Sequence, residues 1–318
     1  MIRINRAMLC SLVTIAALCA GIIVQLAFTQ NVSAHDPRIY TWIGNTATWD
    51  RKLRVSGYRM GCDSGDPDGC VRDVTGAARE NGLTSVFLSL FEDPAHTAAD
   101  ARALSHLSLA QPSVTEVGFD DFVGRYWKLF DRPGFDPPTW LREVVHNLKE
   151  SNPNLGFGIT LYEDDLDSPF LRSPRLPSDI AQRVDFVHLY LHYRTDALQL
   201  PTYVVQARAL FPNAKVIVGL YAYDRIDYIP CAANSHRPCT QQEETQLYSR
   251  AITIAAQMLK DGRIAGIEFY PGFFGKEAEW SGWKHQDYCA PGRVEECIRN
   301  TVVMRENTVV ILQKTFGW

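Results

Sequence analysis

The chain has 318 residues, of which 46% are hydrophobic and 21% are charged. This is the composition of a globular protein, and it excludes a disordered chain, a collagen-like repeat and a coiled coil. The 32 Lys and Arg against 36 Asp and Glu give a formal net charge of -4, and Lys and Arg never form a run longer than two. The charge pattern therefore predicts no nucleic-acid partner.

Residues 1–34 have the features of a targeting segment. Arg3 and Arg6 precede an apolar stretch over residues 7–28, and the small-residue pattern Val-Ser-Ala ends at Ala34. This order is typical of a secretory signal that is cleaved after Ala34. The apolar stretch is also long enough to cross a bilayer, so an uncleaved membrane anchor is the alternative. Both interpretations place residues 35–318 outside the cytoplasm, as a secreted, periplasmic or cell-surface protein.

Six of the eight cysteines follow the targeting segment, and they fall into three pairs whose members are eight positions apart. The pairs are Cys62 and Cys70, Cys231 and Cys239, and Cys289 and Cys297. Equal local spacings inside turn-rich stretches favour three local disulfides over the other possible pairings. Disulfides are typical of an oxidising compartment, which agrees with export.

Short β-rich runs alternate with helix-patterned stretches from residue 39 onward. The predicted strands span residues 39–44, 85–91, 156–162, 184–190, 215–221 and 264–270, with a weaker run over 53–58. The predicted helices span residues 71–81, 119–130, 139–150, 178–183, 202–211, 241–259 and 297–314. This alternation, without a linker that divides it, predicts one α/β domain over residues 35–318 with a parallel sheet.

A closed barrel is favoured over an open sheet, because no strand is followed by a glycine-rich phosphate-binding turn. We therefore predict a single (β/α)8-like TIM barrel with disulfide-tied loops. Only six strands are clear and one is weak. The missing strand is expected between residues 93 and 113, or the barrel is irregular. The tract over residues 94–115, rich in Ala, Ser and His, is expected to be a long loop over the site or a poorly patterned helix.

The residues at the ends of the strands are unusually aromatic and acidic. In a parallel barrel the C-terminal edge of the strands forms the site, and side chains along a strand alternate between its two faces. The predicted inward-facing residues are Ser89, Phe91, Thr160, Tyr162, His188, Tyr190, His192, Gly219, Tyr221, Tyr223, Glu268 and Tyr270. The predicted substrate-binding residues are Trp42, Tyr162, His188, Tyr190, His192, Tyr221, Tyr223 and Tyr270.

Glu268 is the first candidate catalytic carboxylate. A carboxylate in an apolar strand is costly to bury without a partner, so Glu268 is either catalytic or in an internal salt bridge with an Arg or Lys. The second candidate is Glu163 or Asp164, in an acidic cluster at the end of another strand. Crowded carboxyls raise one pKa and leave another group ionised, which separates acid and base roles. The alternative is a solvated acidic loop or a helix cap.

The strand-end segments ITLYEDD (159–165) and IEFYPG (267–272), in a mouth of Trp and Tyr, resemble those of barrel-type glycoside hydrolases. The resemblance implies a TIM-barrel glycosidase that cleaves a poly- or oligosaccharide with two carboxylates and needs no cofactor. We expect a monomer with a carbohydrate substrate. Contact with a membrane is expected only through residues 7–28, if these are not cleaved.

Two other functions are considered. One is a carbohydrate-binding barrel without turnover. The other is a metal-dependent phosphoesterase or deacetylase, in which His188 and His192 would join Asp164 or Asp224. Because two residues four apart on a regular strand are about 13 Å from each other, the two histidines could not hold one ion. The sequence therefore predicts no metal.

Overall fold

The computed structural model describes residues 38–42, 51–62, 67–81, 83–88, 94–227, 229–233, 235, 237–270 and 289–318. Within these ranges eight parallel strands pair in chain order, and β8 pairs with β1 to close a barrel. The strands are β1 (Ile39–Trp42), β2 (Gly57–Cys62), β3 (Leu83–Leu88), β4 (Glu116–Phe119), β5 (Gly156–Tyr162), β6 (Phe186–Tyr190), β7 (Lys215–Tyr221) and β8 (Gly266–Tyr270). The predicted TIM barrel is confirmed, with one register shift between β2 and β3 at Tyr58 and Arg59.

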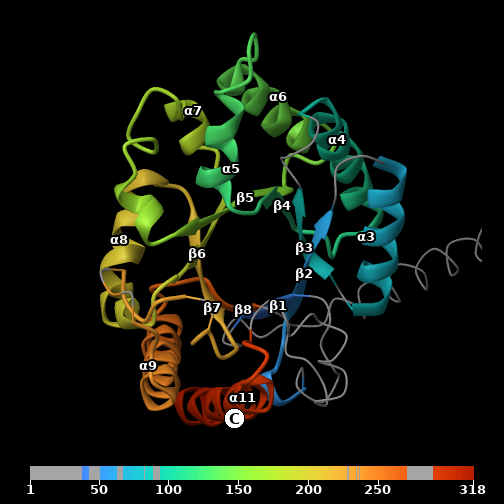
Figure 1. The fold of residues 1–318 in the computed structure, drawn as a ribbon. Coiled ribbons are helices and arrows are strands. Elements are labelled where there is room, and N and C mark those ends of the chain that lie inside the picture. The colour runs from blue at the N-terminus through green and yellow to red at the C-terminus, as the bar shows by residue number, and fades with distance from the viewer. Residues whose placement is uncertain are drawn as a thin grey trace, which may run out of the picture. The chain divides into compact units, whose positions relative to one another are not determined.

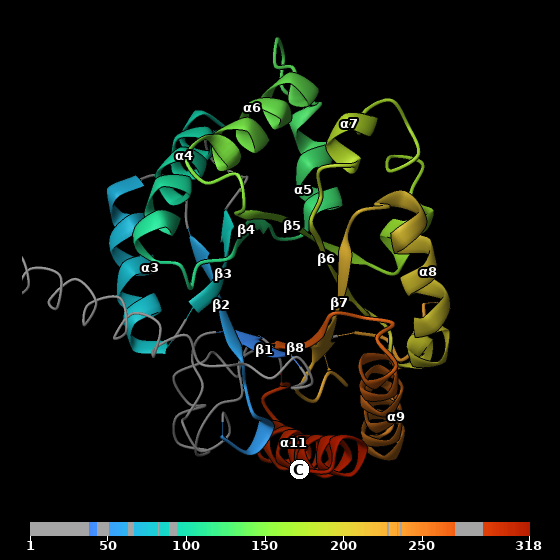
Figure 2. The same cartoon turned by 180° about the vertical axis from the view of Figure 1, so that it is seen from behind.

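Helices surround the barrel, as Figures 1 and 2 show from opposite sides. The α-helices are α3 (Pro67–Asn81), α4 (Pro94–Ala110), α5 (Phe122–Leu129), α6 (Pro137–Glu150), α7 (Ser178–Ala181), α8 (Leu200–Leu210), α9 (Gln241–Lys260) and α11 (Val294–Phe316). Two 3-10 helices, η1 (Asp164–Asp167) and η2 (Arg194–Gln199), follow β5 and β6. The seven predicted helices are present, with ends that differ by up to four residues.

The main core lies between the strands and the helices. Aliphatic side chains that point outward from the barrel, such as Val187, Leu189, Val218 and Ile267, are fully buried there. Their burial leaves the alternate residues of the same strands facing the barrel interior. The sequence-based assignment of the two faces is therefore confirmed for β5 to β8, whereas Ser89 and Phe91 lie outside the described residues.

One fold prediction was wrong, and it concerns the first half of the barrel. The strand missing from the sequence pattern is β4 at Glu116–Phe119, beyond the expected window of residues 93–113. The tract over residues 94–115 is mostly the helix α4, which confirms the second of its two predicted alternatives. The apolar side chains of α4 are spread around the helix axis, so no helical stripe marks it. In addition, the weak run over residues 53–58 overlaps only the first two residues of β2.

All three predicted disulfides are present. The Cα atoms of Cys62–Cys70, Cys231–Cys239 and Cys289–Cys297 are 5.6, 4.6 and 6.1 Å apart. Each bridge closes a short loop, a constraint worth roughly 2–3 kcal/mol by the chain-entropy estimate. The bridges follow the ends of β2, β7 and β8, so they restrain connections at the C-terminal edge of the barrel.

Among the described helices, none combines the length and the apolar composition needed to cross a bilayer. The predicted signal or anchor over residues 1–34 lies outside the described residues.

Candidate active site

Four charged side chains form a layer inside the barrel. Arg59 comes from β2, Glu116 from β4, His188 from β6 and Glu268 from β8. Alternate strands of such a barrel supply the side chains of one interior layer, and that layer is ordinarily apolar. Here the four side chains are at most 5% exposed. We call this set the charged layer.

The charged layer is held by direct contacts between opposite charges. His188 Nδ1 lies 2.6 Å from Glu268 Oε2, and His188 Nε2 lies 2.7 Å from Glu116 Oε1. The Arg59 guanidinium pairs with Glu268 and lies 3.9 Å from Glu116. A buried ion pair is stable only when such partners offset the loss of hydration.

The contacts shift the pKa values of His188 and Glu268. Burial and Arg59 act to lower the pKa of His188, but the carboxylates on its two ring nitrogens raise that pKa above its ordinary value. Burial acts to raise the pKa of Glu268, but Arg59 and His188 outweigh it and lower the pKa to about 2. Each carboxylate of the layer therefore has basic side chains beside it, and these offset the cost of burying its charge.

Glycines on neighbouring strands make room for these side chains. A Cβ on Gly158 would lie 1.9 Å from Glu116 Oε1, and one on Gly219 would lie 2.2 Å from the ring of Tyr190. Real side chains do not tolerate such distances. The glycine at each position is therefore a packing requirement of the barrel interior.

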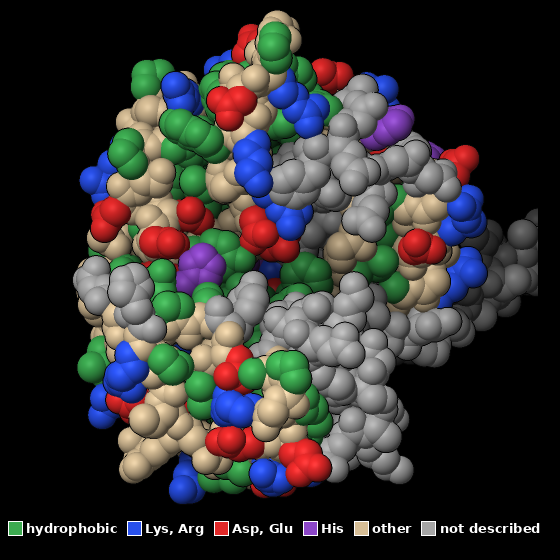
Figure 3. All heavy atoms as spheres, viewed as in Figure 1, with side chains coloured by type: hydrophobic (Ala, Val, Ile, Leu, Met, Phe, Trp, Pro, Cys, Tyr) green, Lys and Arg blue, Asp and Glu red, His purple; other side chains and the backbone are tan. Residues whose placement is uncertain are grey.

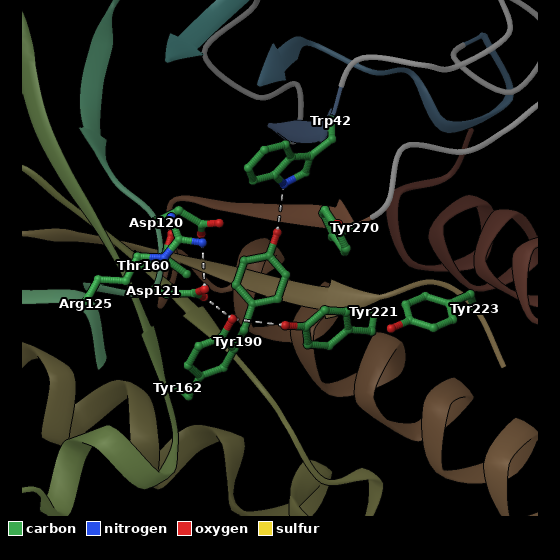
Figure 4. Close-up of a pocket in the computed structure, with 10 residues that line it drawn as sticks. All are labelled: Trp42, Asp120, Asp121, Arg125, Thr160, Tyr162, Tyr190, Tyr221, Tyr223 and Tyr270. Atoms are coloured by element: carbon green, nitrogen blue, oxygen red, sulfur yellow. Dashed lines mark hydrogen bonds and ion pairs between the residues drawn. The ribbon is translucent and has the colours of Figure 1, made fainter. Parts of the chain in front are cut away.

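A pocket of about 210 Å³ opens above the charged layer, and we call it the inner pocket (Figure 4). The described residues that line it are Trp42, Asp120, Asp121, Arg125, Thr160, Tyr162, Tyr190, Tyr221, Tyr223 and Tyr270. Glu268 Oε1 accepts hydrogen bonds from Tyr190 Oη at 2.5 Å and from Trp42 Nε1 at 2.8 Å. The charged layer thus fixes two aromatic side chains of the pocket from below.

Aromatic rings form most of the pocket wall, and their polar atoms are linked. The rings of Trp42 and Tyr270 meet edge to face, with centroids 5.3 Å apart. Tyr221 Oη donates to Tyr162 Oη at 3.2 Å, and Tyr162 Oη donates to Asp121 at 2.5 Å. The pocket therefore offers flat apolar surfaces with fixed polar atoms, a combination that suits a polyhydroxylated ring.

Two successive carboxylates, Asp120 and Asp121, lie side by side on one wall of the inner pocket (Figure 4). They follow β4 directly. Asp121 has the left-handed backbone conformation, with φ 46° and ψ 47°, which few residues other than Gly and Asn or Asp adopt. This conformation interrupts the alternation of the strand. Both carboxylates consequently line the same pocket.

The two carboxylates have different environments. Burial raises the pKa of Asp120 to about 6, assisted by the charge of Asp121 and opposed by Arg59 and Arg125. Asp121 instead lies 3.1 Å from the Arg125 guanidinium and accepts the Tyr162 hydroxyl hydrogen bond. Asp120 therefore holds a proton to higher pH than an ordinary Asp, next to an ion-paired carboxylate. Such a difference separates acid from base roles.

A second pocket, of about 550 Å³, adjoins the first, and we call it the outer pocket. Its described lining is Asp121, Gly124, Arg125, Lys128, Tyr162, Asp164, Asp165, His192, Tyr221, Arg225 and Ile229. The two pockets share Asp121, Arg125, Tyr162 and Tyr221. In the outer pocket the rings of Tyr162 and His192 are stacked, with centroids 3.8 Å apart and planes 9° apart.

Seven of the eight predicted substrate-binding residues line one of these pockets. Trp42, Tyr162, Tyr190, Tyr221, Tyr223 and Tyr270 line the inner pocket, and His192 lines the outer pocket. The eighth, His188, lies in the charged layer below, where its side chain is 1% exposed. Its two ring nitrogens contact Glu116 and Glu268, so His188 holds the charged layer together and does not face the substrate.

The structure does not bring Glu268 into one pocket with Glu163 or Asp164, the predicted partners in catalysis. Glu268 is fully buried in its salt bridge with Arg59, the alternative that the sequence left open. Glu163 is 4% exposed, and its oxygens accept hydrogen bonds from the backbone N–H groups of His192 and Tyr193 at 2.8–3.0 Å. Of the three, only Asp164 lines a pocket, and it lies 3.4 Å from His192 Nδ1.

A metal pair of His188 and His192 is not assembled, because His188 is committed to Glu116 and Glu268. Ligand atoms of Glu163, Asp164 and His192 do lie within 4.8 Å of one another. Glu163 accepts from two backbone N–H groups, and Asp164 contacts the His192 ring. Asp224, the other proposed ligand, accepts a hydrogen bond of 2.7 Å from Asn300 and is fully buried.

Sequence reasoning missed Asp120 and Asp121, together with the charged-layer residues Arg59 and Glu116. The signal for the first pair was present in the segment EVGFDD (116–121), in which alternating residues lead into two acids. This is the form of ITLYEDD at the end of β5. The strand β4 was not predicted because it is only four residues long and contains Glu and Gly, which are uncommon in strands.

Neither a protein-family model nor a curated protein matches this chain. Among solved structures it is similar to a glucosidase from Croceicoccus marinus, with a TM-score of 0.53 and 13% identity over 83% of this chain. The chain spans only 63% of that glucosidase. It is also similar to Bacteroides uniformis beta-glucuronidase 2, with a TM-score of 0.48 and 10% identity over 70% of this chain and 27% of that one. A GH18 chitinase from Pseudoalteromonas aurantia is similar with a TM-score of 0.46 and 11% identity over 83% of this chain and 99% of the chitinase.

At these identities the likeness shows the fold alone, and only the glucosidase exceeds a TM-score of 0.5 among these three. The similarity in fold to barrel-type glycoside hydrolases, predicted from the strand-end segments, is confirmed: this chain has the closed parallel barrel, with an aromatic and acidic pocket at the ends of its strands.

Proposed function

We propose that this chain is an extracytoplasmic glycoside hydrolase in which Asp120 is the general acid. The observation that carries the proposal is the pair of environments on the β4 wall of the inner pocket. Asp120 has a pKa raised to about 6, and the adjacent Asp121 is paired with Arg125. Glycoside hydrolysis requires one protonated and one ionised carboxyl beside the scissile bond.

In the proposed reaction, Asp120 protonates the glycosidic oxygen as the bond to the anomeric carbon breaks. Asp121 is the second carboxylate, which attacks the anomeric carbon or takes a proton from the attacking water. Arg125 and Tyr162 hold Asp121 in place. Asp164, predicted from the sequence, lies in the outer pocket and is the alternative for this second role.

The charged layer supports the same reaction without taking part in it. Among the described residues, the Glu268 carboxylate contacts Arg59, His188, Tyr190 and Trp42, so we propose that it is a positioning residue. It fixes the Tyr190 hydroxyl and the Trp42 indole at the pocket. A preorganised site of this kind avoids reorganisation during the reaction.

Asp120→Asn is the decisive variant. The exported chain is assayed on a panel of aryl monosaccharide glycosides and oligosaccharides. Loss of a general acid should lower kcat by about 10²–10⁴-fold on substrates with a sugar leaving group. The loss should be smaller on a 2,4-dinitrophenyl glycoside, whose leaving group needs no proton. Asp179→Asn, at an exposed ion pair with Arg142, is the matched control and should leave kcat unchanged.

The pH profile provides an independent test. Activity should fall as pH rises above about 6, because Asp120 loses its proton there. Asp120→Glu should retain some activity and shift this alkaline limb. If wild type binds oligosaccharides but hydrolyses no member of the panel, the carbohydrate-binding barrel without turnover is the better description.

Export is part of the proposal. Three disulfides and the N-terminal pattern support it, through a signal cleaved after Ala34 or an anchor over residues 7–28. N-terminal sequencing of the protein recovered from the producing cells distinguishes the two. We also propose that the protein is a monomer and that its substrate is a carbohydrate. Size-exclusion chromatography with light scattering tests the oligomeric state.

A further inference from the structure

We propose that the substrate is an uncharged oligosaccharide that occupies both pockets, with one sugar in the inner pocket and the adjoining sugar in the outer pocket. This inference rests on the proposed glycosidase function, and it names the substrate class and a second binding subsite. It follows from how the two pockets join, from the stacked rings of the outer pocket and from the balance of charge around it.

The two pockets meet at the proposed catalytic carboxylates. Asp120 lines the inner pocket, whereas Asp121 lines both, as do Arg125, Tyr162 and Tyr221. A bond positioned for Asp120 and Asp121 would therefore join a group in the inner pocket to a group in the outer pocket. A monosaccharide with a small leaving group would leave the larger outer pocket unused.

The outer pocket offers a prepared flat surface. The Tyr162 and His192 rings stack at 3.8 Å, and the His192 side chain keeps 27% of its surface exposed. Asp164, 3.4 Å from His192 Nδ1, restrains the imidazole ring. Such a surface fits the apolar C–H face of a sugar ring.

The backbone that carries this surface is fixed from two sides. The N–H of His192 donates to the buried Glu163, and its carbonyl accepts a 2.7 Å hydrogen bond from Arg225 Nη1. Arg225 also lies over the ring of Tyr221, 4.0 Å from its centroid. Glu163 therefore holds the backbone of His192 in place, a role separate from the proposed hydrolysis. A platform fixed before binding costs less entropy when the ligand binds.

The charges around the outer pocket are balanced. Its described lining has three acidic side chains, Asp121, Asp164 and Asp165, and three basic side chains, Arg125, Lys128 and Arg225. Burial raises the pKa of Asp165 to about 6, so the opposite charges are equal in number above that pH and differ by one below it. Figure 3 shows acidic and basic side chains interspersed on the described part of one face, without a field of one sign. A site for an anionic glycan would have an excess of cations. The balance favours a neutral sugar chain.

The experiment compares substrates of increasing length. The probes are neutral p-nitrophenyl monosaccharides, the matching di- and trisaccharides, and the corresponding glucuronides. The variants of the full chain are His192→Ala, His192→Phe, and His146→Ala on the exposed face of α6 as the matched control. Binding of the same sugars to Asp120→Asn is measured by calorimetry, so that affinity is read without turnover.

We expect affinity to increase with chain length from mono- to trisaccharide. His192→Ala should lower kcat/KM on the trisaccharide about tenfold more than on the aryl monosaccharide, which is the effect of about 1.4 kcal/mol of binding. His192→Phe keeps a flat ring and should restore much of the loss, and His146→Ala should match wild type.

Two results would overturn the inference while leaving the glycosidase function intact. One is hydrolysis that Asp120→Asn abolishes but that His192→Ala changes equally for short and long substrates. The other is a preference for glucuronides over neutral sugars. If no probe is hydrolysed and none binds to Asp120→Asn, both the proposed function and this inference are wrong.

Discussion

The hydroxyl of Tyr190 donates a 2.5 Å hydrogen bond to Oε1 of Glu268, and this contact joins the inner pocket to the charged layer. Tyr190 lines the pocket, whereas Glu268 is fully buried beneath it. Burial and the adjacent carboxylate keep the pKa of Tyr190 well above its ordinary range, so its hydroxyl remains a donor to Glu268. Changes to the buried layer should therefore be detected in activity as well as in stability.

Tyr190→Phe removes this hydrogen bond while the ring remains. The free energy of unfolding should fall by about 1.5–3 kcal/mol, because the lost partner served a charged group. We expect kcat/KM to fall about tenfold as Trp42 and Glu268 rearrange. The matched control is Tyr248→Phe, which breaks a buried 3.0 Å hydrogen bond to Thr308 outside the site. Equal kcat/KM values for the two variants would contradict the link between Glu268 and the pocket.

Arg59→Met tests the charged layer itself. The substitution leaves Glu116 and Glu268 without their guanidinium partner, and breaking such a buried pair costs about 3–5 kcal/mol. Denaturant unfolding measures the loss. Arg142→Ala also removes an arginine from an ion pair, with Asp179, but both of those side chains are about half exposed. Arg142→Ala should lower the free energy of unfolding by only a small fraction of the loss caused by Arg59→Met. Equal losses for the two variants would contradict a buried charged layer whose side chains stabilise one another.

Stability should fall as pH rises from about 4.5 to 7.5. Burial raises the pKa of Asp120 from 3.8 to about 6 and that of Glu163 from 4.5 to about 7. In that range the folded chain binds more protons than the unfolded chain, so raising the pH favours unfolding. His188 acts in the same direction. Its stabilising contribution is complete below pH 6.5 and is lost as pH rises through its raised folded pKa.

Glu268 acts at the other end of the scale. Its folded pKa of about 2 stabilises the protein above pH 4.5, and this contribution is lost as pH falls toward 2. Thermal unfolding across pH should thus show a higher Tm near pH 4.5 than at pH 7.5. Glu163→Gln should flatten the slope. A Tm that increases steadily to pH 7.5 would show that the buried acids do not retain their protons.

Gly219→Ala should displace the Tyr190 ring, because the added Cβ would lie 2.2 Å from it. Overpacking of this kind costs about 1–3 kcal/mol, and activity should fall with the movement of the ring. Gly76→Ala is the matched control in α3, where the added methyl meets nothing within 4 Å. That variant should gain about 0.5–1 kcal/mol of stability, since alanine is the better helix former. An active Gly219→Ala protein would show that the position of Tyr190 is not critical.

The alternation of side chains was sufficient to predict the aromatic part of the pocket wall. Tyr162, Tyr190, Tyr221 and Tyr270 were placed inside the barrel from the apolar residues that flank them, because the two-residue period of a strand is a local property. The disulfides could be predicted for a similar reason. Their partners are eight residues apart, so the chain between them leaves few other geometries.

The partners of Glu268 could not be predicted in this way. Trp42, Arg59, His188 and Tyr190 come from β1, β2 and β6, and they meet Glu268 only because the barrel closes with a particular register. The sequence indicated that a carboxylate buried in an apolar strand has either a charged partner or a catalytic role. It did not identify the partner as an arginine more than 200 residues earlier.

The sequence by itself determined the fold class, the local disulfides and the aromatic interior, since hydrophobic periodicity and short-range spacing act between residues that are close along the chain. Only the tertiary structure decided which carboxylates line the pocket. Asp120 and Asp121 lie there because β4 ends in a left-handed turn, and Glu163 and Glu268 are directed into buried contacts. The burial and pairing of a charge depend on residues distant in sequence, and these set its pKa and its role.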